Sequence, residues 1–114
     1  MTKFTDPPIF TQTYDLIKWI YEEPAIFPKY QRFLLANQIQ DESLELLKCF
    51  ISLRQNFESE SNFKRADIHL ETLILLLRLA KDLTFLKFRK YETVTKMLDE
   101  IGRLLGDWQK RKSV

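Results

Sequence analysis

Two clusters of basic residues are the groups in this 114-residue sequence whose types and spacing suit a chemical function. They comprise Lys87, Arg89 and Lys90, set among the rings of Phe85, Phe88 and Tyr91, and then Lys110, Arg111 and Lys112. Basic side chains neutralise phosphates and aromatic rings stack on unpaired bases, a combination typical of proteins that bind single-stranded nucleic acid. Alternatively, the same rings pack against hydrophobic residues where a helix begins, and the lysines are only exposed to solvent.

The charge of the chain is unevenly distributed. Residues 1–86 carry 10 basic and 12 acidic side chains, whereas residues 87–114 carry 8 basic and 4 acidic ones, so the overall charge of +2 conceals a positive C-terminal part. Such an imbalance suits a polyanion or an acidic partner surface, and it is also typical of a solvated, lysine-rich helix end.

Residue types that catalyse reactions or hold metals are sparse. The single histidine, His69, excludes a paired-histidine metal site, and we expect it on the surface or in the polar lane of the third helical segment. The sequence contains no glycine-rich phosphate loop and no nucleophile motif. We therefore expect a binding protein and no enzyme, with no metal and no cofactor.

The cysteine content and the apolar runs of the sequence indicate the cellular compartment in which the protein is expected. The single cysteine, Cys49, has no partner within the chain for a disulfide, and its apolar neighbours favour packing as a small hydrophobe. The longest apolar run, residues 73–77, is too short to span a bilayer, and no signal peptide is evident. A cytoplasmic protein with no membrane partner is expected.

Periodicity and helix-breaking residues predict four helices, at about residues 9–22, 28–58, 62–83 and 88–110. Ser61 or Asn62 is the expected N-cap of the third. Because the links are short, consecutive helices must run antiparallel. The sequence thus predicts an all-α fold in which residues 1–114 form one up-down-up-down four-helix bundle.

Three of these segments show an apolar stripe that is expected to face the core. In the first it is Phe10, Tyr14, Ile17, Ile20 and Tyr21. In the second it is Leu35, Ile39, Leu46, Phe50, Leu53 and Phe57. In the last it is Val94, Met97, Leu98, Ile101, Leu104, Leu105 and Trp108.

The third segment is apolar around nearly its whole circumference. Leucines such as Leu75 and Leu79 fall outside any single stripe, and the polar lane is narrow, consisting of Glu71, Arg78 and Asp82. One small bundle needs only a stripe, so the surplus predicts contact with another copy of the chain. A helix that is unusually central in its own bundle is the alternative.

Gly102 and Gly106, the two glycines of the chain, lie together on the shoulder of the last helix. Each costs a helix interior about 1 kcal/mol relative to alanine. Bare backbone there would let a neighbouring helix or copy approach closely. In the alternative, Gly106 only ends the helix.

Three stretches together resemble a known family: "FPKYQRFLLANQIQ", "LETLILLLRLAKDL" and "YETVTKMLDEIGRLLGDW". They are similar to Avd, the accessory variability determinant of diversity-generating retroelements, and to the four-helix bundle proteins encoded within intervening sequences of ribosomal RNA genes. The resemblance covers roughly residues 9–110. It implies a bundle that assembles as a pentameric barrel, binds nucleic acid with little sequence preference and associates with the retroelement reverse transcriptase.

In that family the protein assists the mutagenic copying of a template RNA into cDNA and is not itself the polymerase. The residues that match basic positions of the family pattern, and that the resemblance marks for partner binding, are Lys29, Arg32, Arg78, Lys81 and Arg103. The basic side chains at residues 87–90 and 110–112 are expected to bind nucleic acid on their charge. An oligomeric bundle with only a structural or scaffolding role is the second hypothesis.

Overall fold

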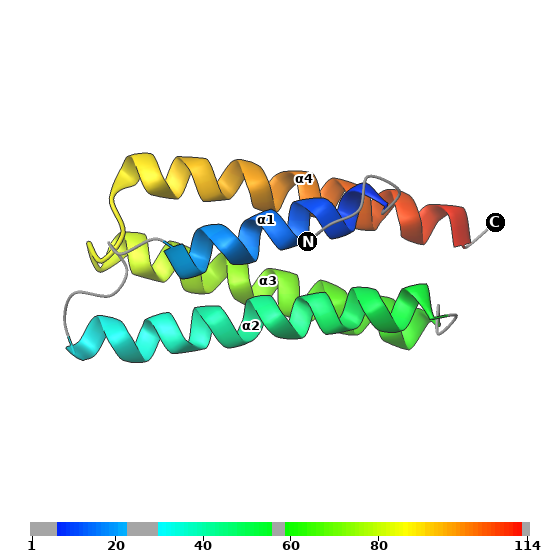
Figure 1. Cartoon of the computed structure of the whole chain (residues 1–114), viewed down its shortest axis with the longest axis horizontal. Helices are drawn as coiled ribbons and strands as arrows, with labels where there is room; N and C mark the ends of the chain where they lie inside the picture. The colour runs from blue at the N-terminus through cyan, green and yellow to red at the C-terminus, as the bar shows by residue number, and fades with distance from the viewer. Residues whose placement is uncertain (1–6, 23–29, 56–58, 113–114) are drawn as a thin grey trace.

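The computed structural model of the chain describes residues 7–22, 30–55 and 59–112. They form four helices: α1 (Pro8–Glu22), α2 (Tyr30–Arg54), α3 (Glu60–Asp82) and α4 (Phe88–Lys112). Consecutive helices run antiparallel (Figure 1). The main interfaces join α1 to α2, α2 to α3, α3 to α4 and α4 back to α1, so the helices surround one core. The predicted all-α class with four helices is confirmed, and the described residues include no strand.

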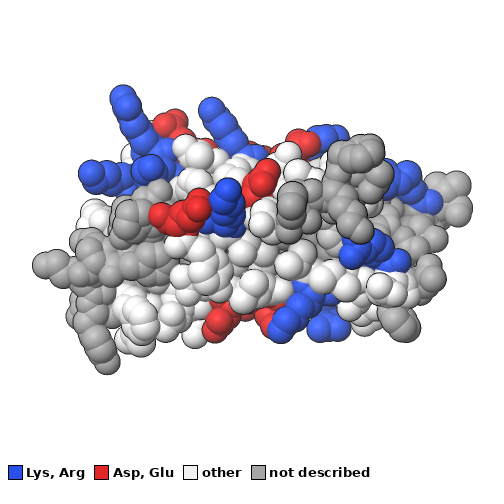
Figure 2. Space-filling model, viewed as in Figure 1, with Lys and Arg blue, Asp and Glu red and all other residues white. Residues whose placement is uncertain are grey.

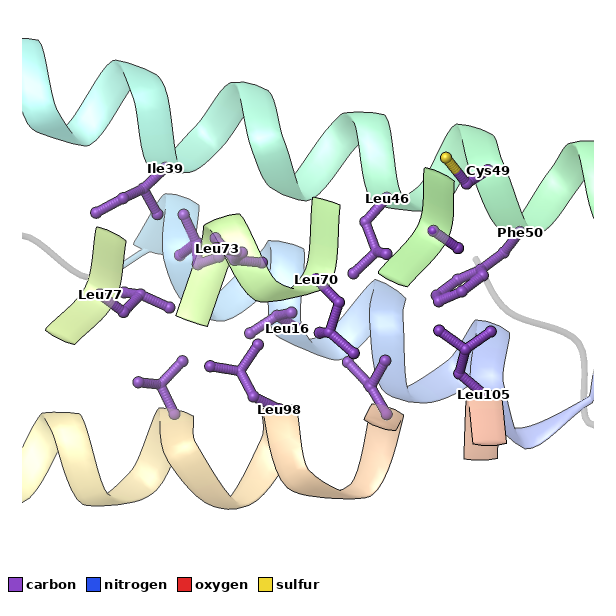
Figure 3. Close-up of a cluster of buried hydrophobic side chains, with 14 of the residues drawn as sticks. Leu16, Ile39, Leu46, Cys49, Phe50, Leu70, Leu73, Leu77, Leu98 and Leu105 are labelled. Atoms are coloured by element: carbon purple, nitrogen blue, oxygen red, sulfur yellow. The ribbon is translucent and has the colours of Figure 1, made fainter. Parts of the chain in front are cut away.

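Each helix contributes large side chains to the core (Figure 3). Leu16, Leu46, Phe50, Leu73 and Leu105 come from the four helices and are almost completely buried. Among the described residues two polar ones are buried with them, and the side chain of each makes a hydrogen bond within its own helix. Thr13 Oγ1 donates to the carbonyl of Ile9 at 2.7 Å, and Ser43 Oγ donates to that of Gln40 at 2.7 Å. No buried side-chain nitrogen or oxygen among the described residues therefore lacks a hydrogen-bond partner.

The predicted stripe of the first helix is wrong in part. Tyr14 and Tyr21 are exposed, while Ile9, Thr13 and Leu16 are buried. The buried row follows helical spacing from Ile9, and it tolerates a threonine because that hydroxyl bonds within the helix. A search for apolar side chains alone passes over such a residue and includes tyrosines, whose polar tips favour water.

The stripes of the other two segments agree with the structure. In α4, Val94, Leu98, Ile101 and Leu105 are buried, with the remaining three predicted residues packed against them. In α2, Ile39, Leu46, Phe50 and Leu53 are buried, and so is Cys49. Phe57 lies outside the described residues. The helix ends at Arg54, four residues before its predicted end, and its predicted start at residue 28 also lies outside them.

The ends of α3 differ from expectation. The N-cap is Ser59, whose hydroxyl accepts from the backbone N–H of Asn62 at 3.1 Å, so the predicted cap at Ser61 or Asn62 is wrong. At the other end, the N–H of Thr84 donates to the carbonyl of Lys81 at 2.9 Å, and that of Phe85 donates to the carbonyl of Ala80 at 2.8 Å. This is the Schellman pattern of helix termination, and Thr84 adopts the left-handed φ of 63° that it requires.

Candidate nucleic-acid interface

The first basic cluster lies where α4 begins. Lys87, Arg89 and Lys90 are all exposed, and basic side chains project from this corner of the molecule in Figure 2. Of the three rings among them, Phe85 and Tyr91 pack against the core, whereas Phe88 is 63% exposed. Two of the three rings therefore pack, as the second interpretation expects, and Phe88 is the one whose face lies open to the solvent.

The second basic cluster lies at the opposite end of the same helix. Lys110 and Arg111 are exposed, and the side chain of Lys112 lies outside the described part of the structure. A helix of 25 residues is about 37 Å long at 1.5 Å per residue. The two clusters of one subunit thus lie apart, and a nucleic acid that contacts both of them must follow the length of α4.

The basic residues of α3 that match the family pattern are held by an acidic neighbour. Arg78 Nε lies 3.9 Å from Asp82 Oδ2, and Lys81 Nζ lies 3.1 Å from Asp82 Oδ1. Lys81 also sits 4.9 Å from the centroid of the Tyr91 ring, which joins α3 to α4. Arg78 is the more accessible of the two, because its side chain is 62% exposed against 29% for Lys81.

Arg103 on α4 is bound by two carboxylates of its own helix. Its Nε and Nη2 donate to the two oxygens of Glu100 at 3.0 and 2.6 Å, and Nη1 donates to Asp107 at 3.2 Å. The hydrogen bond from Arg103 lowers the pKa of Glu100, and the same contact raises the pKa of Arg103. A partner that binds Arg103 must therefore displace these carboxylates or bind them as well.

The remaining two residues marked by the resemblance are less informative. Lys29 lies outside the described residues. Arg32 lies in the first turn of α2, and its side chain also falls outside the described part.

The expected oligomer contacts lie on the surface of the subunit. Leu75 and Leu79 are 52% and 44% exposed, and Ile68, about two turns before Leu75 on α3, is 62% exposed. At 100° per residue these three side chains point directly away from the buried row of Leu70, Leu73 and Leu77. We call Ile68, Leu75 and Leu79 the outer stripe of α3.

Neither glycine is required by packing within the subunit. A Cβ at Gly102 would meet Leu70 Cδ2 at 3.7 Å, an ordinary contact, and a Cβ at Gly106 would meet nothing within 4 Å. Both residues lie inside α4, which continues to Lys112, so the alternative that Gly106 ends the helix is wrong. Packing among the described residues of one subunit therefore does not explain why these two positions are glycine.

Sequence reasoning missed two features of this surface. The His69 side chain is 22% exposed, and its Nδ1 donates to Glu42 Oε1 at 2.8 Å, so the expectation of a surface or lane residue missed its position between α2 and α3. A pocket of about 390 Å³ opens where α1 begins and α2 and α4 end, and Arg54 lies over the ring of Phe10 in its wall. Neither feature has a local signal, because each joins residues far apart in the sequence.

The described residues provide no cluster of His, Cys, Asp or Glu side chains with the geometry of a metal site. Likewise, none of the described helices combines the length and apolar character needed to cross a bilayer.

The protein is thus an antiparallel four-helix bundle that carries exposed basic side chains at both ends of α4. A family model described as bAvd-like matches residues 9–112. The chain belongs to this family, which confirms the resemblance to Avd seen in the sequence. The curated proteins include no significant match to the chain.

Proposed function

We propose that the protein is a non-catalytic accessory factor of a diversity-generating retroelement, which binds template RNA and cDNA with low sequence specificity and associates with the reverse transcriptase. The observation that carries the proposal is the family match over residues 9–112. The exposed basic side chains at the two ends of α4 support the nucleic-acid part, because binding of this kind rests on cations that replace the counterions of phosphates.

Association with the polymerase is proposed for a different surface. Residues 1–86 are net negative, so this part of the chain can face a basic protein while the C-terminal part faces nucleic acid. Within it, Arg78 and Lys81 match basic positions of the family, and Arg78 is well exposed. Arg78→Glu removes a proposed contact residue, so it is expected to reduce co-purification with the cognate reverse transcriptase even though it makes residues 1–86 more negative, and to leave RNA binding intact.

A homo-oligomer is proposed as the working form, with five subunits as the resemblance implies. The outer stripe of α3 supports it, since three large apolar side chains facing water on one helix are typical of a surface that another protein covers. The glycines support it as well, because the subunit itself does not need them.

Nucleic-acid binding is tested by the salt dependence of affinity. Neutralising Lys110, Arg111 and Lys112 to Gln should lower the slope of log affinity against log salt, by about one for each phosphate that the variant no longer neutralises. A matched control neutralises Lys18, Lys48 and Lys64, which are exposed on the other three helices and change the net charge by the same amount. Fluorescence anisotropy of a labelled RNA measures both.

Equal slopes of log affinity against log salt for the two triple variants would show that the basic residues at 110–112 make no specific phosphate contact and only keep the helix end hydrated. An absence of measurable binding by the parent protein at low salt would favour the structural or scaffolding role instead.

A further inference from the structure

The pocket at the end of the bundle combines features of a site for a small, flat, singly charged group. Its described lining is mostly apolar, from Phe10, Leu53, Leu104 and Trp108, among others, and its volume of about 390 Å³ falls in the range of small-molecule sites, roughly 300–1,000 Å³. Residues at the start of α1 and near the ends of α2 and α4 form this lining, so three helices shape the pocket.

The charged residues of the lining set the charge of the occupant. Arg54, Asp107 and Arg111 all contribute, giving a formal net charge of +1. Arg103 donates to Asp107 at 3.2 Å, which holds that carboxylate on α4. A single phosphodiester carries one negative charge, so the lining matches one nucleotide better than a longer run of anions.

The flat groups of the lining suit a base. Trp108 is half-buried, with its ring 5.9 Å from Phe63 and 6.5 Å from Phe50, so its position is fixed by the core. Unpaired bases stack on aromatic rings and on guanidinium planes, and Arg54 already lies 4.2 Å over the ring of Phe10. An acidic peptide offers the same charge but no flat ring to fill the space.

We propose that this pocket binds one unpaired nucleotide of a single-stranded nucleic acid, with its base against Trp108 and its phosphate near Arg54 and Arg111. This inference rests on the proposed function, because Arg111 also belongs to the basic cluster at residues 110–112. It adds that the cluster favours single strands over duplexes, in which bases are not available for insertion.

The test uses the intrinsic fluorescence of the full chain. Trp19 and Trp108 are the two tryptophans, and Trp19 lies on α1 outside the pocket lining, so the variant Trp19→Phe leaves Trp108 as the single reporter. The probes are a thymidine oligonucleotide, an abasic oligonucleotide with the same number of phosphates, a duplex of equal length and a polyglutamate peptide. Each is titrated at low salt, with anisotropy of a terminal label as an independent measure of binding.

The thymidine strand is expected to quench Trp108 and to bind about tenfold more tightly than the abasic strand, as stacking of one base predicts. The duplex and the peptide are expected to leave the emission unchanged. Arg54→Gln should reduce both the quenching and the affinity for the thymidine strand, whereas Arg65→Gln, which removes the same charge outside the pocket lining, should keep the quenching.

If Arg54→Gln unfolds the protein, Pro8→Phe serves in its place, because Pro8 is exposed at the pocket and a larger ring there should obstruct it. Equal binding of the thymidine and abasic strands without quenching would overturn the pocket and leave the proposed function standing. Equal quenching by the duplex or by polyglutamate would also overturn it, in favour of a general anion site. If the parent protein binds neither the thymidine strand nor the duplex at low salt, both the pocket site and the proposed nucleic-acid binding are rejected.

Discussion

Charged side chains on the surface of α3 and α4 differ in what surrounds them, and this difference decides which of them is available to a ligand. Arg103 makes three hydrogen bonds to carboxylates, whereas Arg89 and Arg111 form no ion pair among the described residues. Binding a phosphate at Arg103 has to offset the loss of those bonds, so its net gain is small. The salt dependence of nucleic-acid binding should therefore come mainly from the ends of α4.

Asp67 on α3 provides a test of stability against pH. Partial desolvation raises the pKa of its carboxyl above the usual 3.8 although the residue lies on the surface, and repulsion from Glu71 adds to the effect. A raised pKa in the folded state means that ionisation of Asp67 disfavours folding, an effect absent below the unfolded pKa and complete above the folded one. Asp67→Asn should thus raise the free energy of unfolding at neutral pH by about 0.2–0.5 kcal/mol.

Thermal unfolding of the parent and of Asp67→Asn at a series of pH values measures this difference. It should disappear as the pH falls below the usual pKa of the carboxyl. A difference of constant size at every pH would show that the charge of Asp67 is not its cause.

The turn between α3 and α4 is built on a residue that is poorly suited to it. Thr84 occupies a left-handed position that glycine usually fills, and a β-branched residue pays about 1–2 kcal/mol there. Thr84→Gly should stabilise the protein by about 0.5–1 kcal/mol, after the greater freedom of glycine in the unfolded chain is subtracted. Urea denaturation measures the change, and Thr72→Gly, inside α3, is the matched control that should destabilise instead.

Substitution of the glycines of α4 is expected to affect the stability of one subunit and the stability of the oligomer in opposite directions. Gly102→Ala and Gly106→Ala each fit the subunit without a close contact, so each should stabilise an isolated subunit by about 1 kcal/mol through helix propensity. If the shoulder contacts another copy, the same substitutions should weaken the oligomer. Sedimentation over a range of concentrations reports assembly, and chemical denaturation of dilute protein reports the subunit. Stabilisation with unchanged assembly would mean that the glycines serve no contact between copies.

The helices of this protein are easier to predict from sequence than their ends or the pocket. The core row of α4 follows from spacing alone because its polar and apolar faces are distinct. The Schellman turn escaped prediction because Thr84 lacks the glycine signal, and the buried row of α1 was misplaced because Thr13 satisfies its hydroxyl locally. The pocket depends on where three helix ends meet, which no single segment of the sequence encodes.

The outer stripe of α3 determines how the whole molecule should behave in solution. Leu75→Gln with Leu79→Gln leaves the core untouched and keeps good helix formers, so the subunit should stay folded while the oligomer dissociates. Light scattering measures the mass, with about five subunits expected for the parent. Tyr14→Gln with Tyr21→Gln, which alters two exposed hydrophobic residues of α1, should preserve the assembly. A parent protein that is monomeric at micromolar concentration would contradict the proposal.

Three of the four main helix interfaces join helices that are neighbours along the chain, and only the α1–α4 interface joins its two ends. Closing short loops loses little chain entropy, so proteins dominated by such local contacts fold quickly, in about microseconds to milliseconds. The α1–α4 interface requires the longest loop and should form last. Each subunit should therefore complete its fold within its own chain, and any assembly should follow as a separate kinetic phase whose rate rises with protein concentration.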